Sequence, residues 1–389
     1  MRLFLTGLIR YGSCLAQALA SPLRDGRRIG GTVLVLLALP LFVALQLLHW
    51  LGFLLDEILF RGYRRIDVRE PLFVLGPPRS GTTHLHQVLA ADPGMTTFRT
   101  WECVFALSIT GRKLVLALAR LDQVIGGPIA RLAAWLGRRA TPMDDIHPIS
   151  LAEPEEDFLC LMPIAACFLL IVPFPRSSWL WRTARLDTDV SAVDRRRMMR
   201  FYRRCIQKHL YVFGRGKRFL SKNASFSGAP RALLDEFPGA RILYTVRDPA
   251  ETVPSQLSAL RPALRACGFP EIDDRFRDAL ADLLAYYYSH LYAAARDNAG
   301  RMAMLYNVDL RENLADAVSG AMARVDLPVS ESFARRLDEL SAASRTHRSR
   351  HEYSLEEFGL SSADIRRRFE AAYASYDFAS TGMRQEPHA

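Results

Sequence analysis

The sequence predicts an α/β fold in which a central, mainly parallel sheet is flanked by helices. Short apolar runs that read as buried strands alternate with segments of helical periodicity, and this alternation is typical of parallel sheets. A loop rich in glycine, serine and threonine follows the first such run, and a long uncharged segment precedes it. We therefore expect an N-terminal, membrane-associated helical region over residues 1–65, an α/β domain over 70–378 and a flexible tail over 379–389.

Residues Gly30 to Leu55 carry the strongest membrane signal. They contain no charged residue, and a helix of this length, rising about 1.5 Å per residue, exceeds the roughly 30 Å hydrocarbon core of a bilayer. Arginines flank both ends, so the positive charge does not set an orientation. A full span, a re-entrant or in-plane segment, and a buried hairpin bent at Pro40 are the alternatives. Before this segment, residues 1–20 carry apolar side chains at helical spacing, together with Arg2 and Arg10. This pattern is typical of a helix at the membrane interface or of a helix packed on the domain.

Buried strands are expected after this region, at residues 72–75, 218–220, 241–246 and 302–306. Ligands of parallel sheets bind beyond the carboxyl ends of the strands, so the residues just after each strand are the candidates for a site. Two long helical stretches, 111–139 and 276–295, interrupt the alternation. We regard both as candidates to cap an acceptor pocket.

The loop Pro77 to Thr83, with the sequence PPRSGTT, is the most informative element of the chain. It follows the first strand and precedes a helix whose residues Leu85, Val88 and Leu89 share one face. Backbone N–H groups and the helix dipole hold an anion at such a helix N-terminus. The loop also supplies further donors, namely the guanidinium of Arg79 and the hydroxyls of Ser80, Thr82 and Thr83.

The spacing of Gly76 and Gly81 is that of the nucleotide-binding P-loop, G-x-x-x-x-G-K-[ST], but Thr82 stands where that motif has its lysine. This lysine reaches the β- and γ-phosphates of a nucleoside triphosphate. We therefore expect a sheet of the P-loop NTPase type that binds a phosphate without being an ordinary ATPase.

A second landmark follows the strand at 241–246. Arg247 ends that strand, and Ser255 stands eight residues further on, in the next expected helix. One side chain supplies a charge and the other a hydroxyl, so both can converge on a further phosphate. Alone this pattern is weak, because an arginine followed by Asp-Pro after a strand is a common turn.

Together the two landmarks resemble the sulfotransferases that use 3′-phosphoadenosine 5′-phosphosulfate (PAPS). The resemblance implies that the PRSGTT loop grips the 5′-phosphosulfate and that Arg247 and Ser255 hold the 3′-phosphate. Residues 305–310 and 348–360 are similar to the large bacterial branch of the family, and the resemblance covers roughly residues 71–376. The expected donor-binding residues are Arg79, Ser80, Gly81, Thr82, Thr83, Arg247, Ser255, Arg348 and Arg350.

Sulfuryl transfer, by analogy with phosphoryl transfer, needs an in-line attack, a place for charge on the leaving oxygen and a base for the acceptor proton. Lys222 follows a short expected strand and is the candidate to neutralise the bridging oxygen. Members of the resembled family also carry a lysine before this region.

The base has three candidates. Glu102 lies close to where the protein-tyrosine sulfotransferases, which this segment resembles, place their glutamate, although its spacing from Pro93 differs by a few residues. His147 and Glu156 stand in two further polar runs, DDIH at 144–147 and EPEED at 153–157. A histidine titrates near neutrality, and an apolar pocket raises the pKa of a glutamate toward it.

The composition limits the classes of partner that the protein is expected to bind. A formal net charge of +10 suits an anionic ligand or a membrane surface, whereas no zinc-finger spacing and no basic ribbon with interleaved aromatic residues supports nucleic-acid binding. The six cysteines form no C-x-x-C pair, which predicts reduced thiols and neither a disulfide framework nor a zinc site. We expect no metal cofactor, because cationic side chains can serve in its place.

The sequence thus predicts a membrane-associated, PAPS-dependent sulfotransferase of bacterial type that acts on a hydroxyl, or less favourably an amine, of a small-molecule or lipid acceptor such as a glycolipid. Its catalytic domain is expected to face the cytoplasm, where the donor is made, on a re-entrant or in-plane attachment. The alternatives are a P-loop nucleotide kinase or NTPase with Asp248 orienting magnesium, and a membrane-tethered nucleotide-binding scaffold without catalysis.

Overall fold

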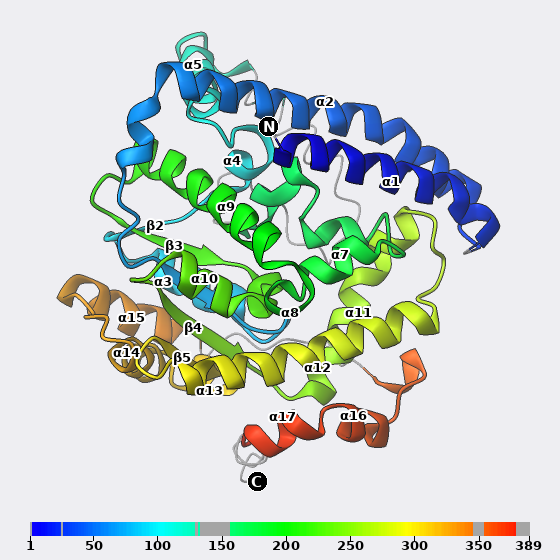
Figure 1. The fold of residues 1–389 in the computed structure, drawn as a ribbon. Helices are drawn as coiled ribbons and strands as arrows, with labels where there is room; N and C mark the ends of the chain where they lie inside the picture. Colours follow the sequence, from blue (N-terminus) through cyan, green and yellow to red (C-terminus); the bar gives the residue numbers. More distant parts are fainter. Residues whose placement is uncertain (1, 25, 129–130, 133–155, 345–353, 379–389) are drawn as a thin grey trace.

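A computed structural model describes residues 2–24, 26–128, 131–132, 156–344 and 354–378. Its centre is a five-stranded sheet in the order β2-β3-β1-β4-β5, and all neighbouring strands are parallel (Figure 1). The strands are β1 (Leu72–Leu75), β2 (Met95–Thr96), β3 (Arg218–Lys222), β4 (Arg241–Val246) and β5 (Met302–Tyr306). The predicted parallel α/β sheet is confirmed; β2 was missed because two residues are too few to show a pattern.

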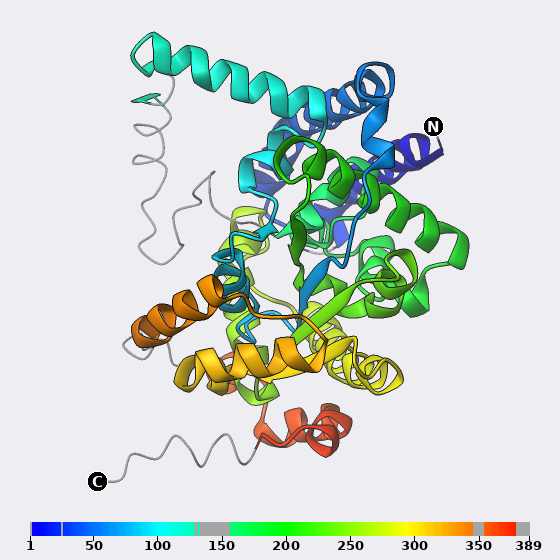
Figure 2. The same cartoon turned by 90° about the vertical axis from the view of Figure 1, so that its left-hand side faces the viewer.

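Alternate residues of β1 enter two different cores, one on each face of the sheet. Leu72 and Val74 pack with α3 (Thr82–Ala90), α14 (Leu314–Arg324) and α15 (Glu331–Ser344). Phe73 and Leu75 pack into the larger core on the other face. That core draws on α9 (Ala192–Phe213), α10 (Pro230–Glu236) and α12 (Asp274–Asp297). Figure 2 shows the sheet between these two groups of helices.

Two long helices, α1 (Arg2–Arg24) and α2 (Ile29–Leu59), form a hairpin that lies lengthwise on the α/β domain (Figure 1). The alternative of a hairpin whose two arms meet at Pro40 is not found: α2 runs unbroken through that residue, and the hairpin turn lies between α1 and α2. In α1 the hairpin is held by Arg10 Nη1, which donates to Ile164 O at 3.0 Å, and in the last third of α2 by Trp50 Nε1, which donates to Pro163 O at 3.0 Å. The start of α2 is held by Arg28 N, 2.8 Å from Gly268 O.

The far end of α2 is fixed by a buried carboxylate. Asp56 accepts hydrogen bonds from the backbone N–H groups of Ile109 and Thr110, at 2.9 and 2.8 Å, and thereby caps α5 (Ile109–Val124). The same carboxylate pairs with Lys208 Nζ of α9 at 2.6 Å, and both side chains are buried. Losing one partner of such a pair costs about 3–5 kcal/mol, so this end of α2 is strongly attached to the domain.

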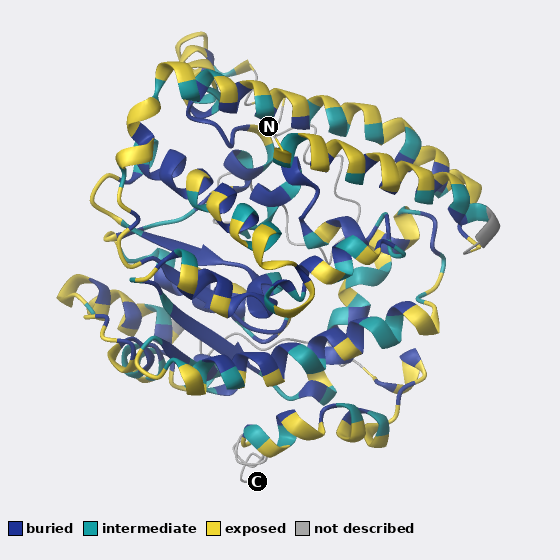
Figure 3. Cartoon of the chain, in the orientation of Figure 1, coloured by how far each residue is buried: buried dark blue, intermediate teal, exposed yellow. Residues whose placement is uncertain are grey.

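The outward face of the hairpin is apolar and exposed (Figure 3). By length and composition both helices are long and apolar enough to cross a membrane, and 22% of the most hydropathic window of each is buried against the protein. Because α2 is attached to the domain at its start and along its C-terminal third, at His49, Trp50 and Asp56, it lies along the protein surface and does not project from it. Its exposed large side chains include Ile29, Val33, Leu34, Leu37, Leu41, Leu47, Leu48, Leu51 and Leu54.

Candidate functional site

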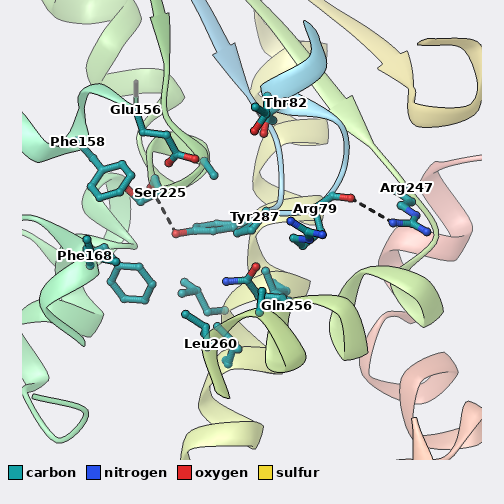
Figure 4. A pocket seen from close by; sticks show the side chains of 18 of the residues that line it. Arg79, Thr82, Glu156, Phe158, Phe168, Ser225, Arg247, Gln256, Leu260 and Tyr287 are labelled. Atoms are coloured by element: carbon teal, nitrogen blue, oxygen red, sulfur yellow. Dashed lines mark hydrogen bonds between the residues drawn. The ribbon is translucent and has the colours of Figure 1, made fainter. Parts of the chain in front are cut away.

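A cavity of about 540 Å³ opens at the carboxyl ends of the strands. Its polar end is formed by residues that directly follow β1, β3, β4 and β5, as the topology of a parallel sheet dictates. Its apolar end is formed by η2 (Asp157–Ile164) and η3 (Phe168–Ile171), together with α11 (Pro249–Ala266) and α12. Figure 4 shows the two ends, with Arg79 and Arg247 on one side and Phe158 and Phe168 on the other.

The predicted loop forms the polar end, between β1 and the N-terminus of α3. Gly76 and Gly81 have φ angles of 142° and 97°, and Arg79 also has a positive φ, of 70°. A Cβ at position 81 would lie 2.5 Å from Asn307 Nδ2, and one at position 76 would lie 2.5 Å from Thr245 O. Only glycine therefore fits at either position, and the loop wraps tightly around the first turn of α3, where backbone N–H groups attract an anion.

The hydroxyl-bearing residues of the loop divide into two roles. Thr82 and Thr83 line the cavity, as predicted for donors to a bound anion. Ser80 is fully buried, and its Oγ donates to Pro77 O at 2.6 Å and lies 2.7 Å from Thr245 Oγ1. The prediction that the Ser80 hydroxyl faces the ligand is therefore corrected: this hydroxyl fixes the shape of the loop.

Arg79, Ser255 and Arg247 lie together at one side of the loop. Arg79 Nε donates to Ser255 Oγ at 3.1 Å, and Arg247 Nη1 is 3.5 Å from Arg79 O. Arg247 also pairs with Glu251 one helical turn further on, and its side chain is 25% exposed. The structure thus brings together the two landmarks that lie far apart in the sequence, and both arginines line the cavity.

Lys222 and Glu156 form an ion pair next to the loop. Lys222 is the last residue of β3, beside β1, and is buried. Glu156 stands just before η2 and lines the cavity, near Thr82 and Phe158 in Figure 4. The predicted lysine and one of the three predicted bases are therefore in contact; Glu156 lines the cavity, and Lys222 lies behind it, not among the lining residues.

A buried network that sequence reasoning missed lies next to this pair. The hydroxyl of Tyr202 donates to the carboxyl group of Asp157 and is 3.1 Å from Ser221 Oγ. Burial raises the pKa of Asp157 to about 7, against the opposing effect of its hydrogen bonds with Tyr202 and Ser221. Asp157 directly follows Glu156 and Ser221 directly precedes Lys222, so the network fixes the backbone on both sides of the ion pair.

The structure places Glu102, one of the three candidate bases, away from the cavity. Its Oε2 accepts from Arg112 Nε and His209 Nδ1, each at 2.8 Å, and its Oε1 accepts from Arg99 N at 3.2 Å. Its side chain is 1% exposed, and it is not among the residues that line the cavity. The carboxylate therefore cross-links α4 (Thr100–Phe105), α5 and α9, and we no longer propose it as the base.

Other predicted residues lie outside the described part of the chain, namely His147, Arg348 and Arg350. Among the described residues, no group of three or more histidine, cysteine or acidic side chains could hold a metal ion. The six cysteines are free thiols, as expected, and Cys267 alone among them is not fully buried.

Several cavity residues were not predicted as site residues. Asn307 directly follows β5 and contacts the loop at Gly81, and its position after a strand is a signal that could have identified it. Tyr287 of α12 donates to Ser225 O at 3.3 Å and forms part of the wall. At the apolar end, Leu280, Leu283 and Leu284 belong to the helical stretch 276–295 that was a candidate cap of the pocket, whereas Leu260 of α11 had read as ordinary helix core.

Comparison with known proteins is consistent with this geometry. A model of the sulfotransferase family matches residues 71–331. Two curated relatives, the omega-hydroxy-beta-dihydromenaquinone-9 sulfotransferases Stf3 of Mycobacterium bovis and Mycobacterium tuberculosis, are each 27% identical over 225 residues, which is 55% of this chain and 52% of theirs. The chain thus spans about half the length of these curated relatives.

Two solved structures share the fold over nearly the whole chain. Sulfotransferase STF9 from Mycobacterium avium superposes with a TM-score of 0.72 at 18% identity, covering 97% of this chain and 96% of its own. Sulfotransferase STF1 from Mycobacterium tuberculosis superposes with a TM-score of 0.67 at 19% identity, covering 93% and 92%. At these identities the likeness confirms the predicted fold.

Proposed function

The chain belongs to the sulfotransferase family, and from this premise we propose that it transfers a sulfuryl group from PAPS to a hydroxyl of a lipid-like acceptor. Membership in the family implies a sulfonate donor. The observation that carries the proposal is the geometry of the cavity, in which a phosphate-binding loop and two arginines face an apolar chamber across the Lys222–Glu156 pair.

The loop and the arginines fit a donor with two separate phosphate groups. The 5′-phosphosulfate would lie at the N-terminus of α3, on the backbone N–H groups of the loop and the hydroxyls of Thr82 and Thr83. The 3′-phosphate would lie at Arg247 and at Ser255, which already holds Arg79. Arg247 is paired with Glu251 in this structure, so a phosphate there would compete with that carboxylate.

Lys222 and Glu156 would act at the transferred group. As the acceptor oxygen forms its bond to sulfur, the bond between sulfur and the bridging oxygen breaks, and negative charge develops on that oxygen. Lys222 would neutralise this charge, and the Glu156 carboxylate would take the proton of the acceptor hydroxyl. The products are the sulfate ester and 3′-phosphoadenosine 5′-phosphate.

The lysine-free loop supports this reaction over the alternative of an ATP-dependent kinase. Thr82 occupies the first position of α3, where a P-loop kinase needs its lysine for the β- and γ-phosphates. A donor that ends in sulfate has no γ-phosphate to bind. The chamber beside the loop supports catalysis over a binding-only scaffold, because it provides space for a second substrate.

The acceptor is proposed to be an amphiphile with a terminal hydroxyl. The chamber is walled by aromatic and aliphatic side chains on η2, η3, α11 and α12, which favours a hydrocarbon chain over a sugar. The curated relatives are described as acting on an omega-hydroxylated dihydromenaquinone. A long chain that presents its terminal hydroxyl to the loop would satisfy both the apolar and the polar end of this cavity.

We further propose that the hairpin attaches the protein to the cytoplasmic face of a membrane, in the plane of the bilayer. Its outward face is apolar, and Arg28, Arg61, Arg64 and Arg65 are exposed near the two ends of α2, where they can meet anionic headgroups. The attachment of α2 along the domain disfavours a perpendicular span. The cytoplasmic side follows from where the donor is made.

The central test is donor binding by charge-removing variants. Arg79→Ala and Arg247→Ala are each expected to weaken binding of 3′-phosphoadenosine 5′-phosphate by about 1.5–3 kcal/mol, or roughly ten- to hundredfold, measured by titration calorimetry. Arg336→Ala, which removes a half-exposed arginine of α15, is the matched control and should leave the affinity for 3′-phosphoadenosine 5′-phosphate unchanged. Unchanged affinity in both site variants would contradict the proposal.

A further inference from the structure

The short connection between α1 and α2, together with the first turn of α2, packs beside the apolar chamber; we call residues 26–31 the elbow. Arg28 N lies 2.8 Å from Gly268 O, and Arg27 Nε donates to Cys267 O at 2.7 Å. Arg27 Nη1 also reaches Pro173 O at 3.4 Å. The elbow therefore touches both the segment after α11 and the segment after η3, the two elements that wall the chamber on this side.

The chamber extends from the phosphate-binding loop toward this elbow. On α11 its lining begins at Gln256, near Arg79, and continues to Leu260. The helix ends six residues later, at Ala266, only about 9 Å further along its axis, and Gly268 at the elbow follows. Leu169 of η3 lines the chamber and is 45% exposed, and Pro173, four residues further along the chain, accepts from Arg27 of the elbow.

The apolar outer face of the hairpin continues to the elbow. Ile29, Val33 and Leu34, in the first two turns of α2, are 73%, 46% and 53% exposed. Leu19, in the last two turns of α1, is 57% exposed. The exposed apolar residues at the start of α2 therefore stand beside the elbow, which contacts the segments that follow α11 and η3; the turn between α1 and α2 lies near the end of α11 in Figure 1.

We propose that the lipid acceptor enters the chamber directly from the bilayer at the elbow, between η3 and the end of α11. This inference rests on the proposed function, because it assumes a lipid acceptor and a membrane-bound hairpin. An amphiphile that leaves the bilayer here exchanges one apolar environment for another. Its hydrocarbon chain avoids the cost of crossing water, about 0.8 kcal/mol for each CH₂ group.

Two adjacent glycines allow a sharp test. A Cβ at Gly31 would lie 2.2 Å from Gly268 Cα and 2.6 Å from the Cys267 carbonyl carbon, so any side chain there must push the elbow away from α11. A Cβ at Gly30 would have no atom within 4 Å. Gly31→Val and Gly30→Val therefore make the same change in composition and helix propensity, but only the first separates the elbow from the chamber wall.

The experiment compares two alcohols as acceptors for the full-length protein. Hexadecanol is presented in phosphatidylglycerol vesicles and butanol in solution, both with PAPS as donor. Gly31→Val is expected to slow transfer to hexadecanol about tenfold or more, which is the equivalent of losing one buried apolar group. Its rate of transfer to butanol and its affinity for 3′-phosphoadenosine 5′-phosphate should remain within about twofold of the parent values. Gly30→Val should leave all three unchanged.

The outcomes separate this inference from the function on which it rests. Equal losses on both alcohols, or no loss on hexadecanol, would overturn the loading route. A parent protein that binds no 3′-phosphoadenosine 5′-phosphate and sulfates neither alcohol would instead overturn the proposed function. If Gly31→Val does not fold, Ile29→Asp serves in its place: a charge at this exposed residue of the elbow should slow transfer to hexadecanol and spare butanol, and equal rates on hexadecanol for this variant and the parent would refute the route.

Discussion

At the scale of single residues, the site depends on charges that are buried and already partnered. Lys222 is buried at the end of β3, where its ammonium group pairs with Glu156. A lysine in such a place needs a carboxylate partner, because an unpaired buried charge is costly. The pair places an ammonium group and a carboxylate side by side, and these are the two groups that the proposed transfer uses.

Removing either partner should therefore affect turnover more than donor binding. Lys222→Ala is expected to lower kcat by about 10²–10³, the range for losing one electrostatic stabiliser of a transition state. Glu156→Gln is expected to lower it by about 10²–10⁴, the range for losing a general base. Affinity for 3′-phosphoadenosine 5′-phosphate, which lacks the transferred group, should fall less than kcat in both.

The matched control is Lys217→Ala, which removes an exposed lysine just before the same strand. Steady-state kinetics with PAPS and a hydroxylated acceptor, combined with calorimetry, would separate the two effects. A Lys222→Ala enzyme with parental kcat would rule out the proposed role of this lysine.

Sequence could identify Lys222 and Arg247 because each directly follows an expected strand, and the ends of parallel strands converge at one edge. It could not rank the three base candidates, because the spacing of Glu102 from the loop does not reveal what its carboxylate contacts. Arg112 and His209, which bind that carboxylate, lie on other helices and have no pattern that links them to it. Buried pairs of this kind are visible only after the chain has folded.

At the scale of elements, η2 connects the hairpin to the reaction site. One side of it presents Phe158 to the chamber, directly after Glu156 and Asp157. The other side presents backbone carbonyls, at Pro163 and Ile164, to the indole of Trp50 and the guanidinium of Arg10. A short helix of this type has few internal contacts, so its position depends on these neighbours and on the carboxyl group of Asp157 at its first residue.

The pH dependence of stability should reveal the environment of Asp157. Burial raises its pKa to about 7 in the folded protein, whereas an unfolded aspartate titrates near 3.9. At a pH between these two pKa values the folded state binds the proton and the unfolded state does not. The contribution of Asp157 to stability therefore falls as the pH rises from about 4 to about 7, and it stays low at higher pH. Asp157→Asn keeps an oxygen for the Tyr202 hydroxyl and does not titrate.

We therefore expect the Tm of Asp157→Asn, relative to that of the parent protein, to rise as the pH of the unfolding experiment is raised from 5 to 8. Asp67→Asn, at a surface carboxylate that is 65% exposed, is the control and should show no such trend. A difference in Tm that is constant across this range would mean that Asp157 is already ionised in the folded protein at pH 5.

Among the elements, the four longer strands, the loop and the helix after it were predictable because each has a local pattern. The 3-10 segments η2 and η3 were not, because their apolar runs fit neither a period of two nor one of 3.6. These two segments nevertheless form the chamber wall. The polar half of the site could thus be predicted from the sequence, and of the apolar half only the helix at 276–295.

At the scale of the whole molecule, the described residues of the hairpin pack on the α/β domain, and the outward face of the hairpin is apolar. The sequence predicted a membrane segment from the length and composition of residues 30–55, and both properties are compatible with a span. The contacts at Gly268, Pro163 and Asp56 show that α2 binds the domain with its inner face, which length and composition do not reveal. The in-plane alternative therefore agrees better with the structure than a span does.

An in-plane hairpin should bind vesicles through its outward leucines. Leu37, Leu41 and Leu48 of α2 are 74%, 78% and 64% exposed and contribute nothing to the core of the domain. Replacing all three by serine should leave the fold and the affinity for 3′-phosphoadenosine 5′-phosphate unchanged. Vesicle binding should weaken by about 1.5 kcal/mol for each leucine, or roughly a thousandfold in total, because each loses the burial of its side chain among acyl chains.

Co-sedimentation with phosphatidylglycerol vesicles measures this change, and Val193→Ser is the control. Val193 is 47% exposed on α9, outside the hairpin, so its replacement should not alter vesicle binding. If the triple-serine variant sediments with vesicles as the parent does, the outward face of α2 is not the membrane-binding surface. If it loses vesicle binding but still sulfates butanol at the parental rate, the hairpin brings the enzyme to its lipid acceptor and takes no part in the transfer itself.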